Sequence, residues 1–187
     1  MTEEQLSLFV KNSDITRKNE SKILMSKDFL HKWKSRIVDH QKNIGNQPQL
    51  RQIDIFAQSD IFNADAIDPF KLLYHPLEFY GLAEKEESNC LYFLVDLVDP
   101  LLLYIGETKQ TPKKRWKNHD CQDYIANYLD LHYRYELKTN LKMAFCWDTP
   151  TDKNNRQNME LLLIHKWRSP FNKESWKYYG QPFKKID

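Results

Sequence analysis

Residues 90–115 read CLYFLVDLVDPLLLYIGETKQTPKKR, and this stretch indicates how the chain is organised. Two apolar runs rich in β-branched and aromatic residues flank Asp99 and Pro100, a pair typical of a turn, and a basic segment follows. The pattern predicts an antiparallel hairpin that leads into a helix. If paired residue numbers sum to an even value, Tyr92 and Tyr104 lie on one face of that hairpin.

The helix after the hairpin is expected to use Thr111 as its N-cap and Pro112 as its first residue. Cations crowd its first turn and its flanks, namely Lys109, Lys113, Lys114, Arg115 and Lys117. Each opposes the helix dipole, at roughly 0.3–1 kcal/mol. These cations form either a solvated charged face or a site for an anionic ligand, and we favour the anion site.

Hydrophobic periodicity predicts the other elements. We expect a helix over 27–41 capped by Ser26, a short strand at 51–57, a short helix at 69–73, a helix over 120–131, a strand at 141–147 and a helix over 155–167. The helix over 27–41 carries lysines and an arginine on its polar faces, which indicates either solvation or contact with DNA.

Glu160 lies inside the run Met159 to Ile164, in a helix that is apolar around much of its circumference. A carboxylate there is costly to bury unless it is paired or holds a metal. The pairing alternative is an ion pair with Arg115, Arg156 or a lysine. The metal alternative is Mg²⁺, which accepts a single carboxylate together with waters and a phosphate oxygen.

Composition limits the class of protein. Hydrophobic residues make up 41% of the 187 residues, which is enough for a folded core. The net charge is only +2, but positive charge is concentrated from residue 104 onward. That part holds 16 of the 28 Lys and Arg and only 10 of the 26 Asp and Glu, a modest excess of the kind found in nucleic-acid-binding proteins. The three cysteines have neither zinc nor disulfide spacing. No signal peptide or membrane span is evident, so we expect no membrane partner and a cytoplasmic location.

The ordered set Leu91-Tyr92, Tyr104-Ile105-Gly106, Arg115, His119, Glu160 and Asn172 resembles the GIY-YIG nuclease family. The resemblance covers about residues 88–175 and departs from the family pattern at Cys90, where the family name has Gly. It implies an α+β fold with a small antiparallel three-stranded sheet flanked by helices. The chain then divides into a mainly helical extension at 1–87, for DNA specificity or docking, the nuclease-like domain at 88–175, and an aromatic and basic tail at 176–187.

The resemblance also implies a chemistry, Mg²⁺-dependent hydrolysis of DNA phosphodiester bonds, with Mn²⁺ as a substitute ion. Its site residues would be Tyr92, Tyr104, Arg115, His119, Glu160 and Asn172, with Glu160 as the metal ligand and Lys109, Lys113, Lys114 and Lys117 on the DNA. Arg115 offers a permanently charged fork for phosphate oxygens. A tyrosine or His119 would take the proton from water, and the sequence does not decide between them.

Other interpretations stay open at several points. The same fold can serve as a non-catalytic DNA-binding or protein-interaction module, and the acid Glu107 beside the motif together with the near-zero net charge leaves room for that alternative. Asn172 is either a phosphate or sugar ligand or a turn residue after a helix. The tail aromatics either stack on bases or pack back on the body. A restriction-type enzyme that cuts both strands of a palindrome would need a homodimer.

Overall fold

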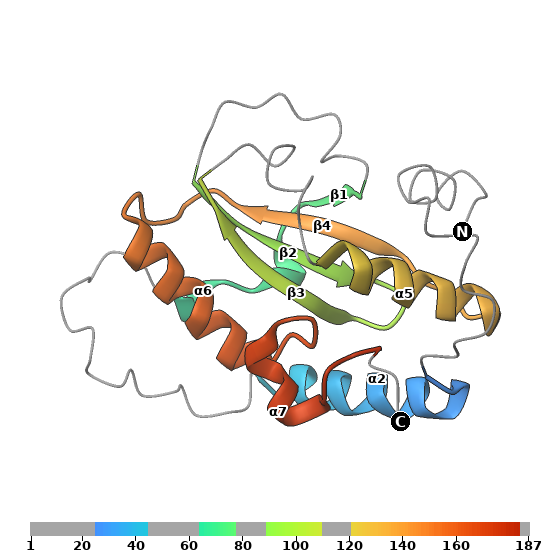
Figure 1. The fold of residues 1–187 in the computed structure, drawn as a ribbon. Coiled ribbons are helices and arrows are strands. Elements are labelled where there is room, and N and C mark those ends of the chain that lie inside the picture. The colour runs from blue at the N-terminus through green and yellow to red at the C-terminus, as the bar shows by residue number, and fades with distance from the viewer. Residues whose placement is uncertain (1–24, 45–63, 78–88, 110–120, 184–187) are drawn as a thin grey trace.

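The computed structural model describes residues 25–44, 64–77, 89–109 and 121–183. In chain order these residues form helix α2 (Lys27–Lys42), the 3-10 turns η4 (Ala64–Ala66) and η5 (Pro69–Lys71), strands β1 (Tyr74–Pro76), β2 (Cys90–Asp96) and β3 (Leu101–Thr108), helix α5 (Cys121–Arg134), strand β4 (Leu141–Cys146), helix α6 (Lys153–Trp167), the 3-10 turn η6 (Lys173–Ser175) and helix α7 (Trp176–Tyr179) (Figure 1). The expected α+β class is confirmed. The expected strand at 51–57 and the expected helix start at Thr111 lie outside the described residues.

The sheet has four antiparallel strands in the order β1-β4-β2-β3, so the expectation of three strands was wrong. The additional strand, β1, is short and contains Pro76, which confines it to an edge because proline cannot donate to an inner ladder. Its partner is β4, with Tyr74 opposite Ala144. The sequence did not reveal β1, because three residues are too few to show an alternating pattern.

A β-bulge at Leu103 controls the faces of the hairpin. Near the turn Asp96 pairs with Leu101, whereas beyond the bulge Leu94 pairs with Tyr104, so one extra residue stands on β3. An extra residue shifts the alternation of side chains by one position. Tyr104 therefore lies on the same face as Tyr92. The even-sum register that was the condition for this holds for the pairs beyond the bulge, whereas the pairs next to the turn sum to an odd value.

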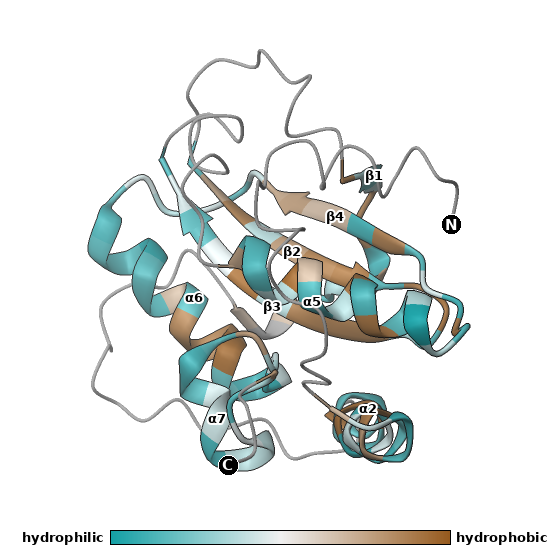
Figure 2. Ribbon diagram, turned by 45° about the vertical axis from the view of Figure 1, so that its right-hand side comes forward, coloured by the Kyte–Doolittle hydropathy of each residue, from teal (hydrophilic) through white to brown (hydrophobic). Residues whose placement is uncertain are grey.

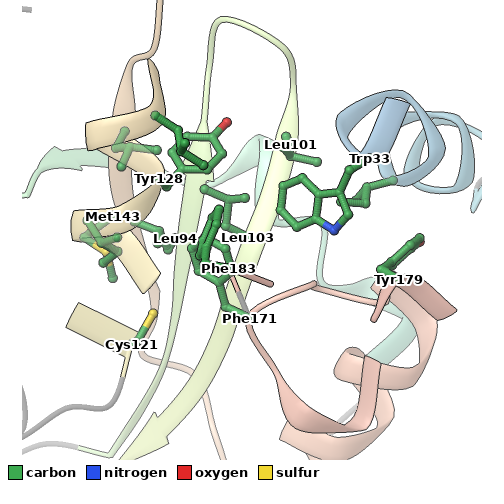
Figure 3. Packing of buried hydrophobic residues seen from close by; sticks show 14 of the residues in the cluster. Trp33, Leu94, Leu101, Leu103, Cys121, Tyr128, Met143, Phe171, Tyr179 and Phe183 are labelled. Atoms are coloured by element: carbon green, nitrogen blue, oxygen red, sulfur yellow. The ribbon is translucent and has the colours of Figure 1, made fainter. Parts of the chain in front are cut away.

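One face of the sheet is covered by α5, α2 and the C-terminal segment. Trp33 of α2 packs against Phe171 and Phe183, with ring centroids 6.5 and 6.1 Å apart. Figure 3 shows these two phenylalanines between the hairpin, α2 and α5, beside Leu94 and Leu103. Of the tail aromatics, Tyr179 and Phe183 are buried, so they pack back on the body.

The other face of the sheet is covered by α6. Met159, Leu163, Ile164 and Trp167 of this helix pack on apolar residues of the three longer strands. Figure 2 shows the apolar colouring on the strands and on the second half of α6. Ser26 caps α2 by accepting a hydrogen bond from the Phe29 N–H, as expected from the sequence. Asp152 caps α6 in the same way through the Asn155 N–H, so this helix begins at Lys153, two residues before the expected start.

The outer edge of β3 is closed by side-chain amides rather than by another strand. Gln41 of α2 accepts a hydrogen bond from the Leu102 N–H (2.8 Å) and donates to the Leu102 carbonyl (2.9 Å). Asn172 accepts from the Ile105 N–H (3.0 Å) and donates to the Ile105 carbonyl (2.9 Å). These pairs replace the backbone partners that an edge strand lacks.

A buried polar network joins α2, the hairpin turn and α5. Asp96 is fully buried and accepts hydrogen bonds from the Tyr128 and Thr139 hydroxyls, at 2.8 and 2.9 Å. The Lys34 ammonium lies 2.9 Å from the Asp99 carboxylate and 3.0 Å from His132 Nε2. Asp96 and Asp99 supply the negative charge that offsets burial of Lys34.

The contacts of His132 require its neutral form. Its Nδ1 lies 2.7 Å from the Tyr128 carbonyl oxygen, which can only accept, so Nδ1 carries the hydrogen. Nε2 must then accept from the Lys34 ammonium. Burial, followed by the charge of Lys34, lowers the pKa of His132 below its ordinary value of 6.5. Burial likewise lowers the pKa of His40.

None of the helices in the described ranges is long and apolar enough to cross a bilayer.

We expect the free energy of unfolding to fall as the pH is lowered from about 7.5 to about 5.5. Because the pKa of His132 is lower in the folded chain, unfolding takes up a proton, and the stability present above the ordinary pKa is lost below it. Urea unfolding at three pH values measures the slope. His132→Gln should flatten it, whereas His31→Gln on the exposed side of α2 should not. An unchanged slope in His132→Gln would contradict the assignment.

Candidate functional site

Three of the residues expected in the site, Tyr104, Glu160 and Asn172, line one cavity of about 760 Å³. Tyr104 comes from β3, Glu160 from α6, and Asn172 from the turn after α6. The first half of α5 and the segment that follows Asn172 complete the walls. Residues separated by up to 68 positions in the sequence therefore meet at the β3 edge.

The two tyrosines have different surroundings. Their rings lie on the same face of the hairpin with centroids 5.9 Å apart and planes inclined at 35°. Tyr104 is half-buried and lines the cavity, whereas Tyr92 is only 1% exposed and does not. Tyr104 is thus the tyrosine that a molecule in the cavity would touch, and Tyr92 supports it from within the core.

Gly106 provides the space for the Tyr92 ring. The two residues are direct partners across the hairpin. A Cβ at position 106 would lie 2.7 Å from Tyr92 Cε2 and still closer to Cζ and Oη. Because Tyr92 is enclosed in the core, its ring has no room to move aside. The glycine is therefore required by a close approach of the side chain opposite it.

Gly106→Ala should lower the free energy of unfolding by about 1–3 kcal/mol, the usual cost of overpacking. Urea unfolding measures this loss. In a Tyr92→Ala background the same substitution should cost much less, because the ring that it meets is gone. Equal costs in the two backgrounds would show that Tyr92 does not set the requirement for glycine.

Arg156, one of the ion-pair partners considered for Glu160, is engaged elsewhere. It is 1% exposed, and its Nε donates to the Glu107 carboxylate at 2.7 Å. Its Nη1 donates to the Pro150 and Thr151 carbonyls. Glu107 is therefore the partner of a buried arginine, which explains the acid beside the tyrosine motif. Glu160, one helical turn further along, is half-buried at the cavity wall.

Asn172 uses its side-chain amide to hold the edge of β3. Besides its two bonds to Ile105, its Oδ1 accepts from the Ser169 hydroxyl at 2.6 Å, and its side chain is 6% exposed. The neighbouring Phe171 N–H donates to the carbonyl of the bulge residue Leu103 at 2.9 Å. Asn172 thus fixes the strand segment that carries Tyr104. Its contact with phosphate or sugar stays a prediction.

Asn172→Ala should lower the free energy of unfolding by about 2–4 kcal/mol, because it leaves both buried backbone groups of Ile105 without partners. Gln41→Ala should have a similar cost through Leu102. Urea unfolding measures both, with the exposed Asn154→Ala on α6 as the control, expected within about 0.5 kcal/mol. Unaltered stability in Asn172→Ala would mean that the amide bonds to Ile105 contribute nothing.

Several expected site residues lie outside the described residues, namely Arg115, His119, Lys113, Lys114 and Lys117. Lys109 is the last described residue before that gap and is exposed. The structure therefore brings together Tyr104, Glu160 and Asn172, places Tyr92 directly behind Tyr104, and does not test the cations.

The described walls of the cavity are acidic. Asp123, Glu160 and Glu174 face Lys173 as the one cation among the described lining residues. Within the described ranges, no three His, Cys, Asp or Glu side chains are placed to hold a metal together. A metal at Glu160 would take one carboxylate from this part of the chain and otherwise water and substrate oxygens. That ligand set fits Mg²⁺.

The cysteines are free thiols, as the spacing indicated. Burial raises the pKa of the Cys90 thiol to about 12. Burial also raises the pKa of Cys146. A thiol with a raised pKa is a poor nucleophile at neutral pH. Cys90 and Cys146 therefore offer no nucleophile for the site.

The described residues form a small α+β domain. Its hairpin carries two tyrosines on one face, and Tyr104 and the helical residue Glu160 line the same cavity. The comparison with family models finds that residues 88–175 match the GIY-YIG catalytic domain. The match confirms the resemblance seen in the sequence, over the same residues, and the matched range spans the positions of all six expected site residues. Neither the curated proteins nor the solved structures gave a match. Helix α2, strand β1 and residues 176–183 lie outside the matched segment.

Proposed function

We propose that the chain is a Mg²⁺-dependent endonuclease that hydrolyses DNA phosphodiester bonds. The observation that carries the proposal is that Tyr104 and Glu160 line one cavity inside the segment that matches a nuclease family. A tyrosine phenol can activate a water molecule, and a carboxylate can bind a metal ion. Both groups face this cavity.

Tyr104 is the chain's candidate for handling the attacking water. Its ring lies at the cavity wall. The strand is held on one side by β2, and at the edge Asn172 and Phe171 bond to the two residues that flank Tyr104, Ile105 and Leu103. A fixed phenol can orient a water molecule and accept its proton where a nearby cation favours the phenolate. His119 remains the alternative proton carrier. Tyr92 acts as a positioning residue behind Tyr104.

Glu160 would hold Mg²⁺, which when bound neutralises charge on the phosphate and the leaving oxygen. Arg115 would bind the phosphate oxygens through its planar guanidinium. Lys109, Lys113, Lys114 and Lys117 would contact the DNA backbone and make binding depend on salt. Asn172 holds the strand and completes the wall between Tyr104 and the C-terminal segment.

We propose the same three parts of the chain, 1–87, 88–175 and 176–187, but a different role for the described residues of the first part. Helix α2 and strand β1, both before residue 88, pack into the body, so they serve the scaffold. Sequence specificity would then reside in other segments. A homodimer is proposed only for a substrate in which both strands of a palindrome are cut.

Tyr104→Phe should reduce Mg²⁺-dependent cutting of supercoiled plasmid by about 10²–10⁴-fold, the usual size of a lost acid-base group. Glu160→Gln should reduce it at least as strongly, because it removes the carboxylate proposed to hold Mg²⁺. EDTA should abolish cutting by the wild type. Tyr92→Phe, which keeps the buried ring, should reduce it far less.

The matched control is Glu174→Gln, which removes another carboxylate from the same cavity and should retain activity within about tenfold. DNA affinity is measured in parallel by fluorescence anisotropy. A folded wild type that binds DNA but cuts no plasmid, branched or single-stranded substrate would favour the non-catalytic binding module instead.

A further inference from the structure

Part of the cavity wall comes from outside the matched nuclease segment. Trp176 and Gln181 line it, and both follow residue 175. Their segment is anchored by Phe183, which is 7% exposed and packs against Phe171 at 5.9 Å and Trp33 at 6.1 Å. This wall is therefore an ordered addition to the domain.

The charge of the described walls is unsuited to a second phosphate. Three carboxylates, on Asp123, Glu160 and Glu174, oppose the single ammonium of Lys173. With Mg²⁺ held by Glu160, the charges of this part of the cavity would balance, so it has no excess of positive charge to attract a second anionic group. A neutral ligand with hydrogen-bond donors would be accepted there.

The remaining groups suit a nucleobase. Tyr124 and Trp176 are half-buried at the wall, with ring centroids 6.4 Å apart and planes at 72°. Amide side chains come from three separate elements, Asn127 on α5, Gln157 on α6 and Gln181 after α7. Aromatic rings stack on bases, and amides both donate to and accept from the polar edges of bases.

We propose that this cavity holds one unpaired nucleobase of the DNA, next to the phosphate at which Tyr104 and Glu160 act. The inference rests on the proposed function and adds its substrate class, DNA with an unpaired nucleotide such as a bulge, flap or single strand. The volume of about 760 Å³ lies within the range of roughly 300–1,000 Å³ usual for small-ligand sites. Pairing within an intact duplex would keep the base out of the cavity.

The test is a binding assay that does not require cleavage. Three DNAs are compared by fluorescence anisotropy with Ca²⁺ in place of Mg²⁺: a paired duplex, the same duplex with one bulged nucleotide, and the same bulge made abasic. Wild type should bind the bulge at least about fivefold more tightly than both other DNAs, as expected from a stacked base. The double variant Gln157→Ala/Gln181→Ala should weaken this preference, because it removes hydrogen bonds to the base edge while the rings of Tyr124 and Trp176 remain. The exposed Asn154→Ala should keep the full preference.

Equal affinity of wild type for the bulge and the abasic bulge would overturn the inference. So would a preference that persists unchanged in the double variant shown to be folded by circular dichroism. Cleavage of plasmid with Mg²⁺ is scored separately. A wild type that prefers the bulge without cutting any DNA would refute the proposed hydrolysis while supporting the base site, so the two failures are distinguishable.

Discussion

The outer edge of β3 is the constraint on which the rest of this structure depends. An edge strand exposes backbone donors and acceptors that are costly to bury unpaired. Here the edge of β3 is buried beside the cavity that Tyr104 faces, whose other walls come from α5, α6 and the C-terminal segment. The side-chain amides of Gln41 and Asn172 supply the hydrogen bonds that a neighbouring strand would otherwise make to the backbone. Gln41 bonds to Leu102, and Asn172 bonds to Ile105. The edge thereby becomes a wall of the candidate site.

The bulge at Leu103 determines on which face of the sheet Tyr104 lies. Without the extra residue, Tyr104 would point to the opposite face of the sheet from Tyr92, toward the side that α6 covers. With it, Leu103 and Tyr104 both lie on the face of α5 and α2. The Phe171 N–H holds the bulge by bonding to the Leu103 carbonyl. Site geometry thus depends on one irregular residue and on the turn that supports it.

Much of this arrangement was predictable from local sequence. The remainder depends on contacts between residues that are far apart in the chain. The hairpin, the cap at Ser26 and α6 follow from patterns within a few residues, whereas the shared face of the two tyrosines also required the bulge, for which the sequence has no local signal. The pairing of Glu107 with Arg156 joins residues 49 positions apart, and neither residue has a local signal for the other. Gln41 did have one, since it continues the stripe of Leu30, Trp33 and Ile37 as a polar residue on an apolar face. A polar residue on such a stripe indicates a buried hydrogen-bond partner.

Helix α2 shows how far the working domain extends beyond the matched segment. Gln41 bonds to β3 and to the Trp167 carbonyl at the end of α6, and Arg36 donates to the Tyr178 carbonyl in the C-terminal segment. Lys34 reaches Asp99 in the hairpin turn and His132 on α5. One helix thus contacts β3, α5, α6 and the C-terminal segment, all of which contribute to the cavity wall. Because the edge of β3 and the C-terminal wall are both held by α2, a chain cut back to residues 88–175 would keep the motif residues but lose the supports that place Tyr104 at the cavity.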